Sequence, residues 1–196
     1  MTAEPAPTPK GEATRQRILD AALEEFAAHG LAGARVDRIA TAAAANKAQL
    51  YAWFGSKAGL FDAVFFGSMH RILDDAPIDA DDLADWAVRL YDDYLRQPEL
   101  IRMASWHRLE RRPTGLLVDD QDRLDAGKLA AIAAAQEAGR VRAGDPFDLM
   151  ALVIAMSTAW SPISGVWAAT ADEPEATHEA RRDLLRRAVA AAVAPD

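Results

Sequence analysis

Apolar residues recur every three or four positions along most of the chain, and this spacing predicts amphipathic α-helices. One such stripe, which Gly30 would end as a C′ residue, consists of Ile18, Leu19, Ala22, Leu23 and Phe26. The pattern predicts a series of helices with the approximate ranges Glu12–His29, Val36–Ala43, Lys47–Phe54, Lys57–Leu73, Asp79–Arg96, Glu99–Glu110, Val118–Gly139, a buried helix opening at Pro146, and Pro174–Val193.

The stretch from Val36 to Lys57 has the pattern of two short helices joined by a tight turn. Asn46 stands where an N-cap side chain would accept from the free amides of the second helix. Leu50 and Phe54 would face inward, and the outer face would carry Lys47, Ala48, Gln49, Tyr51 and Ala52. A helix this short is not stable alone in water, so a neighbour must hold it. The outer face, with its small residues, is typical of a helix-turn-helix that places its second helix in the DNA major groove.

Four segments between Thr14 and Phe65 resemble the DNA-binding domain of TetR-family transcriptional regulators. They are TRQRILDAALEEFAAHG (Thr14–Gly30), VDRIA (Val36–Ala40), NKAQLYAWFGSK (Asn46–Lys57) and GLFDAV (Gly59–Val64). The order and spacing of these segments are far more specific than any single short motif. The resemblance implies a homodimer that binds an operator and that a small molecule usually releases.

The sequence departs from the family pattern at two places. Many family members have Gly at the turn where this chain has Ala44, and many have Thr or Ser where this chain has Ala34 and Arg35. The arginine would replace a hydroxyl-to-phosphate contact with a charged one.

The composition supports an all-α fold. The chain has 196 residues, 51% of them hydrophobic, and is rich in alanine, the best helix former. We expect an N-terminal three-helix helix-turn-helix domain and a C-terminal helical ligand-binding and dimerisation domain. The predicted boundaries are a disordered tail at 1–11, the helix-turn-helix domain at 12–57, a connecting helix at 58–74 and the C-terminal domain at 75–196.

The net charge of −8 argues at first sight against nucleic acid as a partner. However, residues 1–60 contain seven basic and six acidic residues, whereas residues 61–196 contain fifteen basic and twenty-four acidic ones. The acidity therefore belongs to the C-terminal part. DNA binding needs only a local basic surface, which the N-terminal part can supply.

The residues predicted to contact DNA are Arg35, Arg38, Asn46, Lys47, Ala48, Gln49, Tyr51, Ala52, Trp53 and Lys57. A lysine can donate to guanine or to phosphate, and a glutamine can bond adenine through both amide atoms. The resemblance implies that Tyr51 and Trp53 lie near the phosphate backbone. Trp53 could instead be a core residue, and Lys57 could bind a phosphate at a helix start or be solvated.

The residues predicted to bind an effector are Trp86, Arg102, Met103, Trp106, His107, Met150 and Trp160. Ligand pockets are mostly apolar with a few polar groups, so this set favours a small apolar or aromatic molecule. Core packing is the alternative for each residue. The resemblance also implies that the last two long helices form a four-helix bundle with a second copy. Two recognition helices would then lie about 34–36 Å apart and require a near-palindromic operator.

No catalytic motif is present. The chain has no Gly-rich phosphate loop, no cysteine and only scattered histidines, and we expect no enzyme activity, no cofactor and no metal. The acids Asp79, Asp81, Asp82 and Asp85 fit the start of a helix better than a metal site. With no signal peptide and no membrane span, the expected location is the cytoplasm.

The function predicted is a ligand-responsive transcriptional repressor. The alternative is an α-helical ligand-binding or interaction module that has lost DNA binding, and a small helical enzyme is a further rival without a motif to support it.

Overall fold

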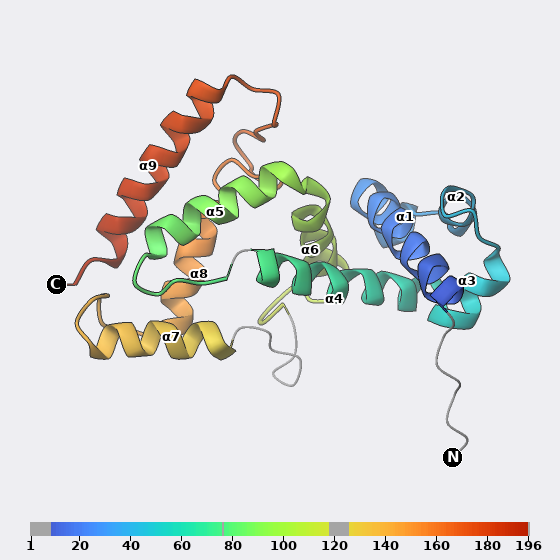
Figure 1. The fold of residues 1–196 in the computed structure, drawn as a ribbon, viewed down its shortest axis with the longest axis horizontal. Helices are drawn as coiled ribbons and strands as arrows, with labels where there is room; N and C mark the ends of the chain where they lie inside the picture. The colour runs from blue at the N-terminus through green and yellow to red at the C-terminus, as the bar shows by residue number, and fades with distance from the viewer. Residues whose placement is uncertain (1–8, 76, 118–125, 196) are drawn as a thin grey trace, which may run out of the picture. The chain divides into compact units, whose positions relative to one another are not determined.

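The computed structural model describes residues 9–75, 77–117 and 126–195, and in these ranges every regular element is an α-helix (Figure 1). The helices are α1 (Pro9–Gly33), α2 (Val36–Ala42), α3 (Lys47–Phe54), α4 (Lys57–Asp75), α5 (Leu83–Arg96), α6 (Pro98–Glu110), α7 (Ala126–Glu137), α8 (Pro146–Ser157) and α9 (Glu175–Val193). The predicted all-α class is confirmed. None of these described helices is long and apolar enough to cross a membrane.

The helix ends follow local capping signals. The predicted range of α3 is confirmed at both ends. Helix α5 begins at Leu83, after the predicted Asp79, because the carboxylate of Asp82 caps it by accepting from the Asp85 N–H at 2.8 Å. Helix α8 begins after Asp145, as predicted, but ends at Ser157, before Pro162. The first eight residues of the predicted helix Val118–Gly139 and most of the predicted tail lie outside the described residues, and α1 already begins at Pro9.

The chain divides into two compact units. The N-terminal unit contains residues 1–68 and 102–115, and the C-terminal unit contains residues 69–101 and 116–196. Helices α4 and α6 therefore each contribute residues to both units.

The core of the N-terminal unit is built from the apolar stripes of its helices. The side chains of Phe26 and Phe61 meet edge to face, with ring centroids 5.1 Å apart. The fully buried residues of this core include Ile18, Ala22, Phe26, Ile39, Leu50, Leu60, Phe61, Phe65 and Met103. The predicted inward stripe of α1 thus packs against α2, α3 and α4.

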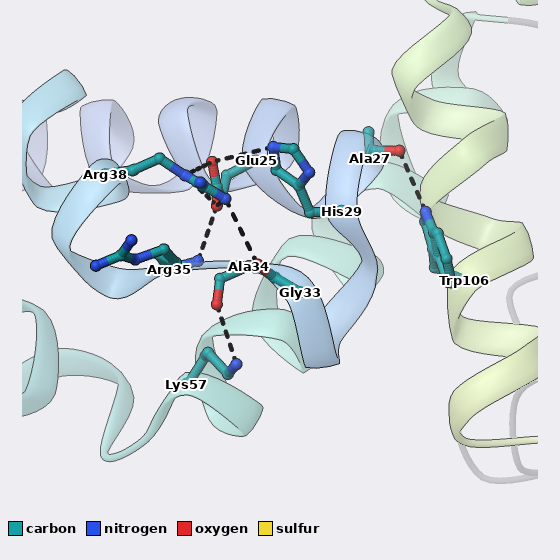
Figure 2. Close-up of polar contacts among 9 residues, drawn as sticks. All are labelled: Glu25, Ala27, His29, Gly33, Ala34, Arg35, Arg38, Lys57 and Trp106. Atoms are coloured by element: carbon teal, nitrogen blue, oxygen red, sulfur yellow. Dashed lines mark hydrogen bonds and ion pairs between the residues drawn. The ribbon is translucent and has the colours of Figure 1, made fainter.

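The C-terminal half of α6 packs on α1 at Gly30. The Trp106 indole N–H donates to the Ala27 carbonyl at 3.2 Å (Figure 2). The Glu110 carboxylate accepts from the Leu31 N–H at 2.8 Å. Gly30 has φ of 65°, and a Cβ added there would lie 2.8 Å from a Trp106 ring carbon and 2.7 Å from a Glu110 oxygen. Glycine is therefore required here both for the backbone conformation and for the close approach of α6.

In the C-terminal unit, α5 packs against α8 and α9 around a single apolar cluster. The largest side chains that α5 buries there are Trp86, Leu90, Tyr91 and Tyr94. The Tyr91 hydroxyl lies 2.7 Å from His178 Nδ1, so α5 and α9 also share a buried polar contact.

Two arginines of α9, Arg181 and Arg182, are each partly buried in an ion pair. Arg181 bonds Glu173 at 2.9 Å and its guanidinium lies over the Trp160 ring, while Arg182 bonds Asp92 of α5 at 2.8 Å. The reason is that acids outside α9 face the side of α9 that carries these two arginines, a non-local arrangement that helical spacing does not show.

The contact of α6 with Gly30 leads to a stability prediction. We expect Gly30→Ala to lower the free energy of unfolding by about 2–4 kcal/mol, because alanine is strained at positive φ and would overlap Trp106. Urea denaturation followed by circular dichroism would measure it. The matched control is Gly67→Ala on the exposed face of α4, where a new Cβ meets nothing within 4 Å. There helix propensity should raise stability by roughly 0.5–1 kcal/mol. Equal effects at the two positions would contradict the packing argument.

Candidate nucleic-acid interface

A reciprocal capping box starts α3. The Asn46 side chain accepts from the Gln49 N–H at 2.8 Å, and the Gln49 side chain accepts from the Asn46 N–H at 3.3 Å. This confirms Asn46 as the predicted N-cap. At the other end, Gly55 leaves the helix with φ of 71°, and the Ser56 hydroxyl accepts from the Gly59 N–H at 2.9 Å to start α4. Side chains therefore satisfy the N-terminal end of α3, and a backbone bond from the Gly55 N–H to the Tyr51 carbonyl closes its C-terminal end.

Only one side of α3 is held by the protein. Leu50 is fully buried, and Phe54 is half-buried, with the Arg15 guanidinium 5.5 Å from its ring centroid. The exposed residues of α3 are Lys47, Ala48, Gln49, Tyr51, Ala52 and Trp53. Tyr51 is 44% exposed and Trp53 is 36% exposed, which argues against the core alternative for Trp53. The outer face predicted for this helix is thus open to a partner.

The turn between α2 and α3 is tight and strained. Ala44 has φ of 48° and, among the described residues, is the one non-glycine position with positive φ. This conformation costs an L-residue about 1–2 kcal/mol, which explains why many family members have glycine there. Two hydrogen bonds offset this cost at Ala44. The Ala45 N–H donates to the Ala40 carbonyl at 2.9 Å, and Arg17 Nε donates to the Ala43 carbonyl at 3.1 Å. Arg17 therefore holds the turn.

Glu25 of α1 fastens the start of α2. Its carboxylate accepts from Arg38 Nε at 2.9 Å and from the Arg35 N–H at 2.8 Å, and its side chain is only 10% exposed (Figure 2). Burial alone would raise the pKa of Glu25, but the hydrogen bonds from Arg38 and Arg35 hold it below its usual value of 4.5. The predicted DNA-contacting residue Arg38 is thus bound to an acid of its own domain.

The predicted lysines also have partners in the protein. Lys57 Nζ donates to the Ala34 carbonyl at 3.1 Å, which ties the start of α4 to the end of α1 (Figure 2). Lys47 forms an ion pair with Asp37 of α2. Arg35 is exposed, and no described residue bonds its guanidinium. The basic side chains of this surface therefore differ in how readily each can reach DNA.

The capping box restricts Gln49. Bonding both amide atoms to adenine needs the carbonyl oxygen, which here accepts from the Asn46 N–H. Gln49 can donate through its amide nitrogen without cost, but a two-atom contact would require it to release the cap.

The predicted effector residues are distributed over both units. Arg102, Met103, Trp106 and His107 belong to the N-terminal unit, and Trp86, Met150 and Trp160 belong to the C-terminal unit. His107 is buried and stacks on Phe65 with ring centroids 3.6 Å apart. Burial lowers the pKa of His107, which keeps the ring neutral at neutral pH. Trp160 meets Tyr91 edge to face at 6.0 Å. The structure thus gives Trp106 and His107 packing contacts within the N-terminal unit.

A surface depression of about 730 Å³ lies in the C-terminal unit. Polar residues line much of it, including Asp79, Asp81, Asp85, Arg89 and Arg140. Two of the acids are paired, Asp81 with Arg140 at 2.6 Å and Asp85 with Arg89 at 3.2 Å. None of the seven predicted effector residues lines this depression.

The arrangement of α2 and α3 is that of a helix-turn-helix DNA-binding protein, and comparison with known proteins identifies the family. Residues 18–64 match the model described as bacterial regulatory proteins, tetR family, and residues 82–190 match the one described as tetracyclin repressor-like, C-terminal domain. The chain belongs to the TetR family of transcriptional regulators. The predicted organisation, a helix-turn-helix domain followed by a helical C-terminal domain, is confirmed.

Individual relatives agree with this assignment. The HTH-type transcriptional repressor SCO4008 of Streptomyces coelicolor is 41% identical over 155 residues, which are 78% of this chain and 80% of that protein. The HTH-type transcriptional repressor NicS of Pseudomonas putida is 29% identical over 109 residues, 52% of this chain and 51% of that protein. The crystal structure of SCO4942, a proposed regulator from Streptomyces coelicolor, is 38% identical, has a TM-score of 0.77, and is matched over 92% of this chain and 98% of its own.

The bonds to Glu25 lead to a pH-dependent prediction. At pH 7 we expect Glu25→Gln to lower the free energy of unfolding by about 1.5–3 kcal/mol, because charge-assisted bonds to Arg38 and Arg35 are lost. A lowered folded-state pKa contributes stability above the unfolded value, and this contribution disappears as pH falls through the folded value. The difference between wild type and variant should therefore be constant near neutral pH and shrink below pH 4.5.

Denaturation at a series of pH values would measure this difference. Glu24→Gln is the matched control, since Glu24 is the exposed neighbour on the same helix and its substitution should change stability by no more than about 0.5 kcal/mol. A difference that does not depend on pH would contradict the role given to the Glu25 carboxylate.

Proposed function

We propose that this protein is a homodimeric repressor that binds a near-palindromic operator through α3 and is released from it by a small molecule. The observation that carries the proposal is the state of α3, a short helix anchored by Leu50, capped at both ends and open on its outer face. The relatives SCO4008 and NicS are both named as repressors, which supports repression over activation.

The proposed DNA contacts differ in kind. Tyr51 and Trp53 are exposed and would donate to phosphates, while Lys47 and Gln49 would reach base edges or phosphates. Arg35 would bind phosphate beside α2. Ala48 and Ala52 would let the backbone approach the groove, and the remaining predicted residues, Arg38, Asn46 and Lys57, would act mainly by holding α2, α3 and α4 in place.

The proposed dimer uses α8 and α9, the last two helices. The exposed apolar residues of α8 follow helical spacing at Ala151, Leu152 and Ala155. Those of α9 do the same at Ala180, Leu184 and Ala188. Leu152 is 47% exposed and Leu184 is 51% exposed. Exposed apolar residues at helical spacing on both helices favour an interaction site here, and small residues let helices approach closely.

The proposed effector is a small apolar or aromatic molecule that binds in the C-terminal unit, among the predicted residues Trp86, Met150 and Trp160. Because α4 and α6 each have residues in both units, a change in the C-terminal unit has a covalent route to the helices that support α3. The ligand can weaken DNA binding only as far as it binds the conformation that cannot bind DNA more tightly than the conformation that can.

One observation favours the alternative, a helical ligand-binding or interaction module without DNA binding. Arg38 and Lys47 are each paired with an acid of the same domain, which reduces the basic character of the surface. DNA binding separates the two proposals directly.

The first test is binding of the purified protein to DNA from upstream of its own gene over a series of salt concentrations. We expect a specific complex that weakens steeply with salt, because neutralised phosphates release counterions. Tyr51→Ala and Lys47→Ala should each weaken it by about 1–3 kcal/mol, roughly fivefold to 150-fold. Tyr51→Phe is the control that removes only the hydroxyl. If neither this DNA nor a randomised pool contained a preferred site, the module without DNA binding would be the better conclusion.

The second test concerns the dimer. We expect Leu184→Glu to produce a monomer and to abolish operator binding, because a charge would be buried in the apolar interface and the two recognition helices would be uncoupled. Sedimentation velocity would measure the oligomeric state. Leu109→Glu is the matched control, since Leu109 is 69% exposed on α6, outside the proposed interface. A Leu184→Glu protein that remained dimeric would place the interface elsewhere.

A further inference from the structure

Residues 158–174, all of which the structure describes, connect α8 to α9 without forming a helix or a strand (Figure 1). Connections longer than about 12–15 residues without secondary structure are uncommon in compact domains and are usually either functional or disordered. This connection has internal hydrogen bonds that define its path. The Ala169 N–H donates to the Trp160 carbonyl at 2.9 Å, and the Ser164 hydroxyl donates to the Ala159 carbonyl at 2.7 Å. An ordered connection of this length therefore calls for a function.

Glu173 fixes the second half of the connection against α9. Its carboxylate accepts from the Trp167 indole N–H at 3.1 Å and from the Thr170 N–H at 3.2 Å, and it pairs with Arg181 of α9 at 2.9 Å. The hydrogen bonds from Arg181 and Trp167 hold the pKa of Glu173 below its usual value of 4.5, which keeps the carboxylate charged at neutral pH. The Trp167 indole is thus held at its N–H edge although 56% of the residue is exposed.

The connection presents apolar side chains to solvent. Val166 is 94% exposed, the highest value for a large apolar residue in the described part of the chain, and Ile163 is 42% exposed. Single exposed apolar residues are normal on protein surfaces. Here, however, Trp167 and the other two lie within one short segment that hydrogen bonds hold in place. Exposed apolar residues that gather in this way favour a surface for another protein.

The position of the connection favours a second copy of this chain as the partner. Exposed alanines of α8 continue up to the connection at Ala155 and Ala159. Exposed alanines of α9 resume directly after it at Ala176 and Ala180. Regulators of the TetR family act as dimers. Because both helices that flank the connection belong to the proposed dimer face, their pairing with a second copy would bring residues 158–174 to the edge of the same interface.

We propose that Trp167 anchors the homodimer, with Val166 beside it, by packing on the C-terminal unit of a second copy. The inference rests on the dimer proposed above and extends its interface beyond the two helices. Tryptophan is enriched among the few residues that carry most of the binding energy of an interface. A side chain that Glu173 already holds in place also loses less conformational freedom on binding than a mobile one.

The first experiment measures the dimer dissociation constant of the full-length protein by sedimentation over a concentration series. Trp167→Ala should raise this constant by roughly tenfold or more, because the anchor is lost. Val166→Asp should raise it similarly, because a carboxylate would be buried against the second copy. Leu109→Asp is the matched control, since Leu109 is 69% exposed on α6, away from α8 and α9, and the constant should not change. Circular dichroism verifies that each variant keeps the helical fold.

A second experiment reports on the segment directly. The chain has no cysteine, so Val166→Cys supplies a single site for an environment-sensitive dye. The emission of the labelled protein should shift to shorter wavelength when an excess of unlabelled wild type is added, because the dye leaves water for the interface. The same dye on Leu109→Cys should show no shift.

The outcomes separate this inference from the proposed function. If the wild type is a dimer, and Trp167→Ala and Val166→Asp dissociate no more readily than it does, the segment does not contact a second copy and the inference is wrong. A dye at residue 166 that does not respond to dimer formation would also overturn it. In both cases the dimer through α8 and α9 would stand, with Leu184→Glu as its own test. A wild type that is monomeric at every concentration contradicts the proposed function itself.

Discussion

The position of α3 depends on the burial of one side chain. Leu50 alone among the residues of this helix is fully buried, and eight residues are too few to be helical in water without tertiary support. The contact of Leu50 with the core holds α3 from one side, and the capping box at Asn46 satisfies the amides that a short helix leaves free. Because only Leu50 is fully buried, the rest of the surface of α3 stays available to a partner. A helix with two buried stripes would have been held more firmly and would have offered less to a groove.

A second constraint is the charge of the protein. The chain carries a net charge of −8, and the acids of its N-terminal unit lie close to the cations that could attract DNA. Arg38 bonds Glu25 and fixes α2, and Lys57 donates to the Ala34 carbonyl just after α1 and fixes α4. The same basic residues that make the surface attractive to phosphate are thus also structural. The acids that balance the charge of this domain therefore also help to order its helix-turn-helix.

Features determined by neighbouring residues could be predicted from the sequence, whereas features determined by distant residues could not. The start of α3 at its Asn46 cap and the start of α8 after Asp145 were predictable, because the deciding side chains lie within three positions of each helix start. The bonds of Glu25 to Arg38 and of Arg182 to Asp92 join residues far apart in the chain, and no local spacing reveals them. The outward face of α3 was predictable from the helical spacing of its residues. That the Gln49 side-chain oxygen accepts from the Asn46 N–H depends on hydrogen-bond geometry, which the spacing does not show. The roles of the predicted DNA and effector residues stay predictions.

The sharing of α6 between the two units has a consequence for modularity. Residues 102–115 complete the N-terminal unit, because Trp106 and Glu110 pack against α1 at Gly30. In the chain, however, they come after α5, which belongs entirely to the C-terminal unit. The N-terminal unit is therefore not one continuous segment of the chain, and a single recombination crossover after α4 could not exchange all of it. An exchange between relatives would have to carry the surface of α1 and the end of α6 together, so these two distant segments are expected to be inherited as a pair.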